Sequence, residues 1–225
     1  MDFETTVMTR RSIRKFKPDP VDREIIRRML ILAGRAPSAM NTQPWEFFVI
    51  TGIPLEKIKQ DNIAALRSAK PAKPEHALSG WPQDSIYRRR QVDLGKQLFT
   101  LMEIPRDDME KRVSWMERGY RYFDAPVAVI VTYDQAFSHP GPLMDIGAVI
   151  QTLCLAATDT GLDTCIEDQG VHYPDVIRRH APIPQSKLMA CAIALGYPDP
   201  DFPANRIQSE RAAVDEITTW IGFGS

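Results

Sequence analysis

The sequence predicts an α+β fold in which a central sheet is wrapped by helices. Three observations support this: helical and extended patterns alternate along the chain, the extended segments are few, and the helical ones are long. The 225 residues are enough for one sizeable domain. No repeat, low-complexity tract or linker divides them, so we expect a single domain over residues 1–225.

The first part of the chain predicts a helix, a loop, a strand and a second helix. Asp22 is a favourable N-cap for a helix with one apolar face, and Gly34 lies near the end of that helix. A loop rich in turn formers at 35–44 leads into a strand at 45–51, which is aromatic and β-branched and closes at a glycine. A helix over about 55–67 follows.

The middle of the chain predicts a long loop and two helices. Residues 70–84 contain three prolines and a glycine, and such long loops often act as lids or binding elements. A basic helical segment then runs from Tyr87 towards Met102, and a polar helix spans roughly 107–118.

The last part of the predicted body holds the strongest patterns. Residues 127–131 form an almost continuous apolar run, as in a strand buried on both faces. The 143–160 segment has apolar residues at helical spacing, and Gly161 follows at the position where a left-handed residue ends a helix. A helix near 174–180 and a strand at 188–195 complete the body.

Composition limits the function classes. The formal net charge is -1, from 28 basic and 29 acidic residues, so no global field attracts nucleic acid or a membrane surface. The three cysteines, Cys154, Cys165 and Cys191, have no CxxC spacing, which favours apolar packing in a reducing cytoplasm over disulfides. No signal peptide pattern opens the chain and no apolar run has membrane-spanning length, so we expect a cytoplasmic protein.

Several catalytic signatures are absent from the sequence. There is no GxGxxG after a strand, no GxxxxGK[ST], no HExxH and no GxSxG. The four histidines are scattered without metal-ligand spacing. We therefore expect neither a metal site nor hydrolysis by a serine triad.

Two motifs remain as candidate binding elements. The first is Arg10-Arg11-Ser12-Ile13-Arg14-Lys15-Phe16, whose guanidinium groups and hydroxyl suit a phosphate monoester. Charge alone would also fit a solvated basic face, but the apolar Ile13 and Phe16 predict that part of the segment packs against the body. The second motif is the loop Pro37-Ser38-Ala39-Met40-Asn41-Thr42-Gln43-Pro44-Trp45, which is either a binding loop or a plain turn with Trp45 in the core.

Together, these motifs resemble the nitroreductase family of FMN enzymes. Further matches follow in the family's order, at Asp145-Ile146-Gly147 through Gln151, Gly161-Leu162-Asp163-Thr164-Cys165, Leu195-Gly196-Tyr197-Pro198-Asp199 and Asn205-Arg206-Ile207-Gln208-Ser209-Glu210-Arg211. The resemblance spans nearly the whole chain. It implies a nitroreductase-like α+β fold with a mostly antiparallel central sheet surrounded by helices, in an intertwined homodimer.

The resemblance also implies roles for the basic motif. Arg10 and Ser12 match ligands of the FMN phosphate, and Arg11 matches a ligand on the phosphate and ribityl side. Arg14 matches a position beside the pyrimidine edge of the flavin ring. A fixed cation there stabilises the negative charge that two-electron reduction places on N1 and O2.

Residues from the second half of the chain match further flavin contacts. Arg211 matches a C-terminal phosphate ligand, and Arg206 is a second candidate nearby. Ile166, Glu167 and Asp168 match the segment that lies against the central ring, where a backbone N–H near Asp168 would point at flavin N5.

A loop from the other subunit completes the flavin site in the family. Pro37, Ser38, Ala39 and Asn41 match this loop, which covers the dimethylbenzene side. The resemblance thus implies a homodimer with FMN at the subunit interface, built partly on the 143–160 helix.

The implied reaction is a ping-pong transfer of hydride from NADH or NADPH through flavin N5 to a small planar acceptor. The expected acceptor is a nitroaromatic, reduced to its nitroso and hydroxylamine forms. No protein residue is assigned a catalytic role, because flavin N5 carries the chemistry. Candidate substrate contacts are Trp81, Tyr87, Arg88 and Phe123, with packing as the alternative role of the three aromatic rings and a solvated helix face as the alternative for Arg88. An arginine among residues 88–90 that faced the pocket would favour a carboxylated substrate such as a nitrobenzoate.

Two other readings stay open on the sequence alone. The first keeps the fold and changes the acceptor, as in quinone or enone reductases, dehalogenases and flavin-cleaving enzymes. The second is a non-catalytic module that binds an anion through the basic motif, although the near-neutral net charge disfavours nucleic acid as its partner.

Overall fold

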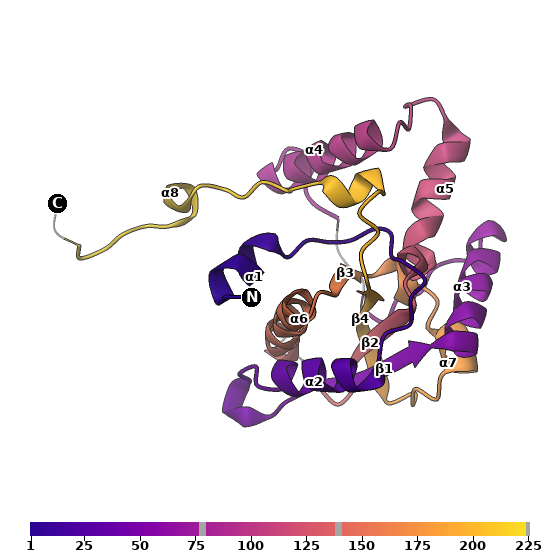
Figure 1. Cartoon of the computed structure of the whole chain (residues 1–225), viewed down its shortest axis with the longest axis horizontal. Coiled ribbons are helices and arrows are strands. Elements are labelled where there is room, and N and C mark those ends of the chain that lie inside the picture. The colour runs from indigo at the N-terminus through magenta and orange to yellow at the C-terminus, as the bar shows by residue number, and fades with distance from the viewer. Residues whose placement is uncertain (77–79, 138–140, 224–225) are drawn as a thin grey trace.

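A four-stranded antiparallel sheet forms the centre of the fold (Figure 1). The structure is a computed structural model that describes residues 1–76, 80–137 and 141–223. The strands are Glu46–Thr51 (β1), Val127–Asp134 (β2), Asp163–Glu167 (β3) and Lys187–Gly196 (β4), in the order β1-β2-β4-β3. Each neighbouring pair is antiparallel, which confirms the predicted α+β class and the antiparallel sheet.

Helices cover both faces of the sheet. Figure 1 shows α1, α2 and α6 gathered beside one face and α3, α5 and α7 beside the other. The helices are α1 (Phe3–Thr9), α2 (Arg23–Ala33), α3 (Gly52–Arg67), α4 (Ile86–Leu101), α5 (Met109–Tyr120), α6 (Gly141–Asp159), α7 (Pro174–His180) and α8 (Val214–Ile217). Four short 3-10 turns lie between them: η1 (Ala39–Asn41), η2 (Tyr122–Asp124), η3 (Gln169–Val171) and η4 (Pro203–Arg206).

Strand β2 separates two hydrophobic cores. Val127, Val129 and Val131 pack with side chains of α2 and α6, whereas Ala128 and Ile130 pack with side chains of α3 and α7. All five are fully buried, because successive side chains of a strand point to opposite faces. The continuous apolar run in the sequence thus reflects a strand with helices on both faces, as predicted.

Helix α6 ends in the glycine motif that the sequence predicts. Gly161 has φ +79°, and its N–H donates to the Thr158 carbonyl oxygen. The Leu162 N–H donates to the Ala157 carbonyl oxygen at 3.0 Å, which completes a Schellman motif. By length and composition, α6 is the one helix among the described residues that could cross a membrane, but half of that stretch is buried in the fold. Its apolar character is that of a core helix.

The structure departs from the predicted elements at several boundaries. Helix α3 begins at Gly52, three residues before the predicted start, because Gly52 adopts φ +61° at the strand-to-helix turn. Strand β3 was not predicted: it is a five-residue edge strand with an acidic residue at each end, so its apolar signal is weak. Within the predicted loop, 70–76 and 80–84 hold no helix or strand, and 77–79 fall outside the described residues.

The three cysteines are free thiols in the interior. Cys154 and Cys165 are buried and Cys191 is half-buried. Burial raises the pKa of the Cys165 and Cys191 thiols to about 12, so at neutral pH both are protonated and poor nucleophiles. These properties agree with the packing role predicted for them.

Candidate functional site

The N-terminal basic segment (residues 10–17) lies along the edge of the sheet. Ser12 forms a parallel β-bridge with Thr164 of β3, and the Ile13 N–H donates to the Thr164 carbonyl oxygen at 2.9 Å. Phe16 forms an antiparallel bridge with Pro198 just after β4. Ile13 is 0% exposed and Phe16 is 2% exposed, so the predicted packing against the body is confirmed.

The C-terminal part of the chain returns to this segment. After β4 the chain turns through η4, and Ala204 and Ile207 pack with Leu98 of α4 in a small apolar cluster. The buried amide of Asn205 then bonds to the peptide groups of Arg14 and Lys15. Residues 10–14 and 207–211 come together from opposite ends of the sequence as a result.

A cavity of about 780 Å³ lies between these two segments. It is lined by Val7, Met8, Thr9, Arg10, Arg11, Ser12, Arg14, Leu94, Gln151, Ile207, Gln208, Ser209 and Arg211. Four of these side chains are arginines, three carry hydroxyls, and none of the described lining residues carries a carboxylate. The cavity is therefore a strongly cationic, hydroxyl-rich site with apolar walls.

The charges of this cavity are only partly balanced from within the chain: burial raises the pKa of the Asp163 carboxyl, and the nearby charges of Arg11 and Arg10 act against that shift. Across the described residues, no ion pair involves Arg10, Arg11, Arg14 or Arg211. Burial lowers the pKa of the Arg14 guanidinium, because its charge is removed from water. Since a desolvated cation is costly without an anion, this arrangement favours binding of a negatively charged ligand.

The donor set indicates which anion the cavity suits. Guanidinium forks bind phosphate oxygens in bidentate fashion, and serine and threonine hydroxyls donate to the same oxygens. Across residues 1–76, 80–137 and 141–223, no group of three or more His, Cys, Asp or Glu residues could hold a metal ion. The cavity thus suits a phosphate monoester held by side-chain donors.

The structure brings only part of the predicted cofactor set to this cavity. Arg10, Arg11, Ser12, Arg14 and Arg211 line it. Arg206 does not line it and is exposed at the end of η4. Gln151, Gln208 and Ser209 line the cavity although the sequence motifs assigned them no role, and no local pattern distinguishes them from other polar residues.

The loop motif at residues 37–41 lies away from this cavity. Pro37, Ala39 and Asn41 are exposed and Ser38 is half-buried. The Ser38 hydroxyl accepts from the Gln43 N–H at 2.9 Å, and the Ala39 N–H donates to an Asp145 carboxylate oxygen at 3.2 Å. These contacts hold the loop against α6 and leave its outer surface open.

The segment predicted to lie against the flavin ring forms the end of β3. Ile166 is 42% exposed on the edge strand. The Glu167 carboxylate is buried, accepts from the Gly170 N–H at 2.7 Å, and has its pKa raised well above the usual value by burial. Asp168 lies 3.4 Å from a His172 ring nitrogen, which lowers the pKa of its carboxyl. None of the three lines the cavity within this chain.

The predicted substrate contacts occupy two different environments. Trp81 and Tyr87 are exposed and pair in a tilted arrangement, with ring centroids 5.5 Å apart and ring planes at 38°. Arg88 is exposed at the start of α4 and donates to Gln91 at 2.7 Å. Phe123 is buried in the core beside α5, so its ring packs against core side chains.

Comparison with known proteins places this geometry in a family context. The sequence model of the Nitroreductase family matches residues 7–197. A nitrobenzene nitroreductase of Ectopseudomonas oleovorans is 32% identical, with 97% of this chain and 96% of that protein covered. A 4-nitrobenzoate reductase of Pseudomonas putida is also 32% identical, with 99% of this chain and 96% of that protein covered.

Solved structures show the same arrangement of the chain. The FMN and NADPH-dependent nitroreductase NfnB from Sphigopyxis sp. strain HMH superposes with a TM-score of 0.93 at 27% identity, covering 99% of this chain and 100% of that chain. The FMN-dependent nitroreductase NfnB from Mycobacterium smegmatis, solved in complex with NADPH, superposes with a TM-score of 0.91 at 26% identity, covering 97% of each chain.

Proposed function

The chain belongs to the nitroreductase family, and from that premise we propose that it is an FMN-dependent NAD(P)H nitroreductase. Its substrate in this proposal is a small nitroaromatic compound, which it reduces to the nitroso and then the hydroxylamine form. Relatives named for nitrobenzene and for 4-nitrobenzoate are equally similar to the chain, which supports a single-ring nitroarene as the substrate class.

One observation carries this proposal: the cavity gathers four arginines from both ends of the sequence without a lining carboxylate. The phosphate of FMN is a doubly charged monoester, and the cavity donors match its oxygens. In the proposed complex, Arg10, Ser12 and Arg211 hold the phosphate and Arg11 lies on the phosphate and ribityl side. The residues present therefore fit FMN.

Arg14 has a separate role in the proposal. Arg14 is half-buried in the cavity wall and forms no ion pair within the described residues. Burial lowers the pKa of its guanidinium, so water screens this charge only in part. When bound, FMN supplies hydride transfer at N5, from NADH or NADPH and then to the acceptor in a ping-pong order. Arg14 would lie beside the pyrimidine edge, as its match to the family implies, and its charge there would stabilise the reduced ring system.

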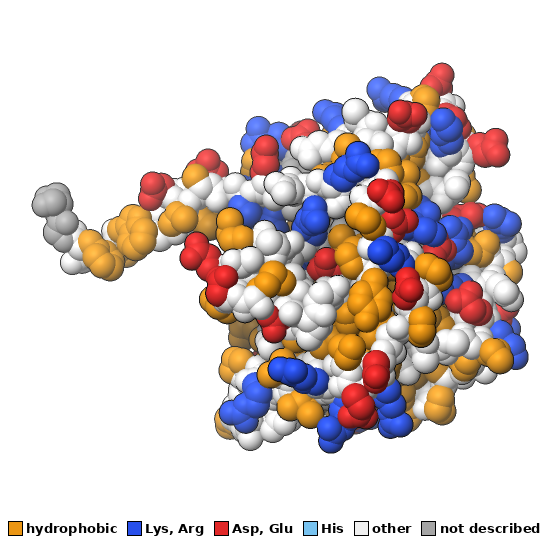
Figure 2. Space-filling model, viewed as in Figure 1, with side chains coloured by type: hydrophobic (Ala, Val, Ile, Leu, Met, Phe, Trp, Pro, Cys, Tyr) orange, Lys and Arg blue, Asp and Glu red, His pale blue; other side chains and the backbone are white. Residues whose placement is uncertain are grey.

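We further propose that the active form is a homodimer with FMN at the subunit boundary. The C-terminal tail (residues 208–223) leaves the body and carries exposed apolar side chains (Figures 1 and 2). Ile217, Trp220, Ile221 and Phe223 are each at least 60% exposed. Contiguous exposed apolar surface of this kind marks an interaction site, and a second copy of the chain would cover it.

The open loop at residues 37–41 fits the same assembly. It is exposed and lies outside the cavity of its own chain. In a dimer, this loop would cover the flavin bound by the second copy. Ile166, Glu167 and Asp168, at the end of β3, would lie against the ring from within the chain that holds the phosphate.

Arg88 gives the proposal a test of substrate class. It lies one residue after the exposed Trp81–Tyr87 aromatic pair, at the start of α4. If this group faces the acceptor, a positive charge beside two aromatic rings favours a carboxylated nitroarene. Arg88→Ala should then raise KM for 4-nitrobenzoate about tenfold more than KM for nitrobenzene, whereas equal changes would remove Arg88 from the substrate site.

The decisive experiment is a spectrum followed by an anaerobic assay. The purified chain should be yellow, with flavin absorption bands, and should consume NADH or NADPH with nitrobenzene under nitrogen. A colourless protein with no affinity for added FMN would instead support an anion-binding module. Loss of the flavin bands that requires oxygen would support a flavin-cleaving enzyme of the same fold.

A further inference from the structure

A buried amide ties the basic segment to the C-terminal part of the chain. Asn205 is 4% exposed. Its Oδ1 accepts from the Arg14 N–H at 2.6 Å, and its Nδ2 donates to the Lys15 and Asp199 carbonyl oxygens at 2.8 Å each. Both amide donors and the acceptor are thus used, so the orientation of Asn205 is fixed by three peptide groups.

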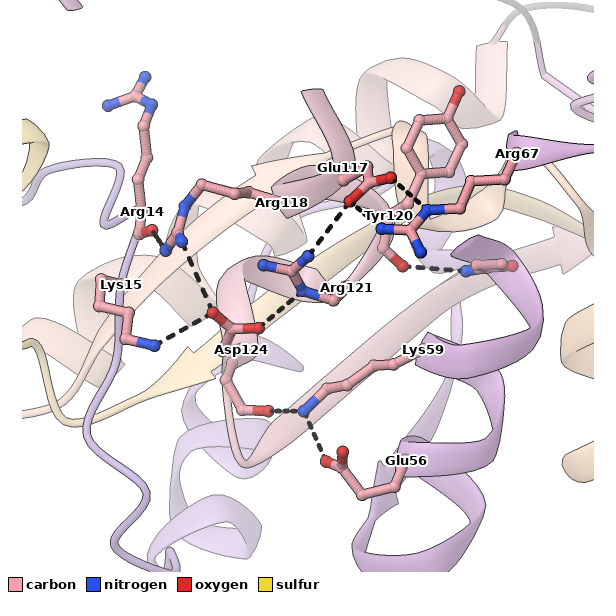
Figure 3. Close-up of polar contacts among 12 residues, drawn as sticks. Arg14, Lys15, Glu56, Lys59, Arg67, Glu117, Arg118, Tyr120, Arg121 and Asp124 are labelled. Carbon is pink, nitrogen blue, oxygen red and sulfur yellow. Dashed lines mark hydrogen bonds and ion pairs between the residues drawn. The ribbon is translucent and has the colours of Figure 1, made fainter. Parts of the chain in front are cut away.

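A second buried side chain reaches the same peptide from α5. Arg118 Nη2 donates to the Arg14 carbonyl oxygen at 2.7 Å (Figure 3). Its guanidinium lies 4.5 Å from the Phe202 ring centroid, and its Nη1 lies 3.7 Å from an Asp124 carboxylate oxygen. The Arg118 side chain is 14% exposed. The Arg14 carbonyl oxygen, the Phe202 ring and the Asp124 carboxylate together fix its position.

These contacts hold the backbone of Arg14 at both of its polar groups. The N–H is bound by Asn205 and the carbonyl oxygen by Arg118, from segments far apart in the sequence. Figure 3 shows the Arg14 side chain pointing away from Arg118. With the backbone fixed, the Arg14 side chain can move only by changing rotamer. In the structure, its Nη1 donates to the Ser12 carbonyl oxygen at 3.1 Å.

Asp124 binds the next residue of the segment, Lys15. Its carboxylate accepts from Lys15 Nζ at 3.1 Å and from Arg121 Nε at 2.9 Å. Three cations, including Arg118, therefore surround one acid beneath the basic segment (Figure 3). The segment is supported by a connected polar network, which restricts its movement relative to α5.

We infer that Asn205 and Arg118 are positioning residues that fix the Arg14 peptide and so set how strongly the cavity prefers reduced over oxidised FMN. This inference rests on the proposed function. Neither residue lines the cavity, so each acts through Arg14. Because Coulomb energy in a poorly solvated site changes steeply with distance, a small shift of Arg14 would alter the stabilisation of the reduced flavin anion.

The test measures the midpoint potential and the Kd of FMN in the holoenzyme. Arg118→Lys keeps the charge but loses the guanidinium fork, and Asn205→Leu keeps the approximate volume but loses all three hydrogen bonds. The matched control is Arg112→Lys, because Arg112 also lies on α5, sits 4.6 Å from the centroid of an aromatic ring, Phe99, and donates to a carbonyl oxygen, that of Pro105, at 3.2 Å. We expect reduced FMN to lose about tenfold more affinity than oxidised FMN in Arg118→Lys, which lowers the potential by about 30 mV. Arg112→Lys should leave the potential unchanged, because Arg112 contacts neither Arg14 nor Asp124.

A double-mutant cycle separates positioning from general loosening of the fold. In an Arg14→Met background, Arg118→Lys should no longer change the potential, because the group through which it acts is gone. A potential unchanged by Arg118→Lys, or lowered equally in both backgrounds, would overturn the inference. If Asn205→Leu does not fold, the Arg118 cycle still decides the question. A wild-type chain that binds no FMN would instead refute the proposed function.

Discussion

The two segments that supply arginines to the cavity are held in opposite ways. The N-terminal basic segment is fixed by its own chain: Ile13 and Phe16 are fully buried, and Asn205 and Arg118 hold the peptide between them. The C-terminal tail has no such anchors. Its hydrogen bonds within the described residues join tail residues to one another, as in Arg211 to Ser209 and Trp220 to Asp215.

The N-terminal and C-terminal halves of the cavity are therefore ordered by different contacts. One chain is sufficient to place Arg10, Arg11 and Arg14, because the cost of ordering their backbone is offset by buried contacts. Arg211 sits on a tail whose apolar side chains are exposed in the described chain, so under the proposed homodimer its order would come from the second copy. In the proposed dimer, the anchored half binds the phosphate first and association completes the site.

Removing the tail tests this contrast most strongly. Ending the chain after Arg211 deletes four large side chains, Ile217, Trp220, Ile221 and Phe223. Each contributes about 1.5–3 kcal/mol when buried, so the loss of all four should weaken the dimer by at least about 6 kcal/mol, roughly ten-thousandfold or more in Kd. Light scattering across a dilution series measures this. A truncated chain that stays dimeric at the same concentrations would show that the tail is not the interface.

A core mutation in the anchored segment should instead lower the free energy of unfolding. Phe16→Ala removes a ring that is 2% exposed and should lower the free energy of unfolding by about 3–5 kcal/mol. Phe3, which is 79% exposed, provides the matched control: Phe3→Ala should change it by less than about 0.5 kcal/mol. Urea denaturation of both variants in the chain that ends after Arg211 compares them without the contribution of association. Similar losses would mean that the segment is not anchored as described.

The two kinds of arginine should differ in their effect on FMN affinity. Arg14→Ala removes a preordered, partly desolvated charge and should weaken FMN binding by about 1.5–3 kcal/mol, or roughly 10- to 150-fold in Kd. Arg211→Ala should weaken FMN binding less than Arg14→Ala does. In the wild type, the entropy lost on ordering the exposed tail offsets part of the binding free energy that Arg211 contributes. Flavin fluorescence titration measures both, with the exposed Arg27→Ala on α2 as a control. A larger loss of FMN affinity in Arg211→Ala than in Arg14→Ala would contradict this prediction.

Acid should loosen the anchored segment in a way that depends on Asp124. Burial raises the pKa of this carboxyl, but Arg121, Lys15 and Arg118 together outweigh burial and hold the pKa below its usual value. The stability it contributes is therefore present above the unfolded pKa of about 3.8 and is lost as the pH falls through the folded pKa.

Asp124→Asn should reduce the fall in the free energy of unfolding at acid pH, by about 0–1 kcal/mol for each ion pair that the carboxylate makes. Urea midpoints measured between pH 6 and pH 2 in the mutant and the wild type check it, because the loss falls below the unfolded pKa of about 3.8. Asp215→Asn in the tail is the control. An unchanged pH profile in Asp124→Asn would exclude this carboxylate as part of the anchor.

The sequence alone determined most of the elements and half of the cavity. Helical spacing of apolar residues predicted α2 and α6, and a continuous apolar run predicted the buried strand β2, because these signals are local and strong. The alternation of basic residues with Ile13 and Phe16 predicted a segment that packs down while it presents cations, and Arg211 was assigned to the same site by family resemblance.

The tertiary structure alone decided which distant groups meet. Asn205 and Arg118 have no local pattern that marks them, yet both bind the Arg14 peptide across more than a hundred residues of sequence. Phe123 shows the reverse: its ring could stack on an aromatic substrate or pack in the core on the sequence alone, and the turn at η2 places it in the core. Spacing along a chain reports local geometry, whereas long-range hydrogen bonds and burial depend on how separate elements pack.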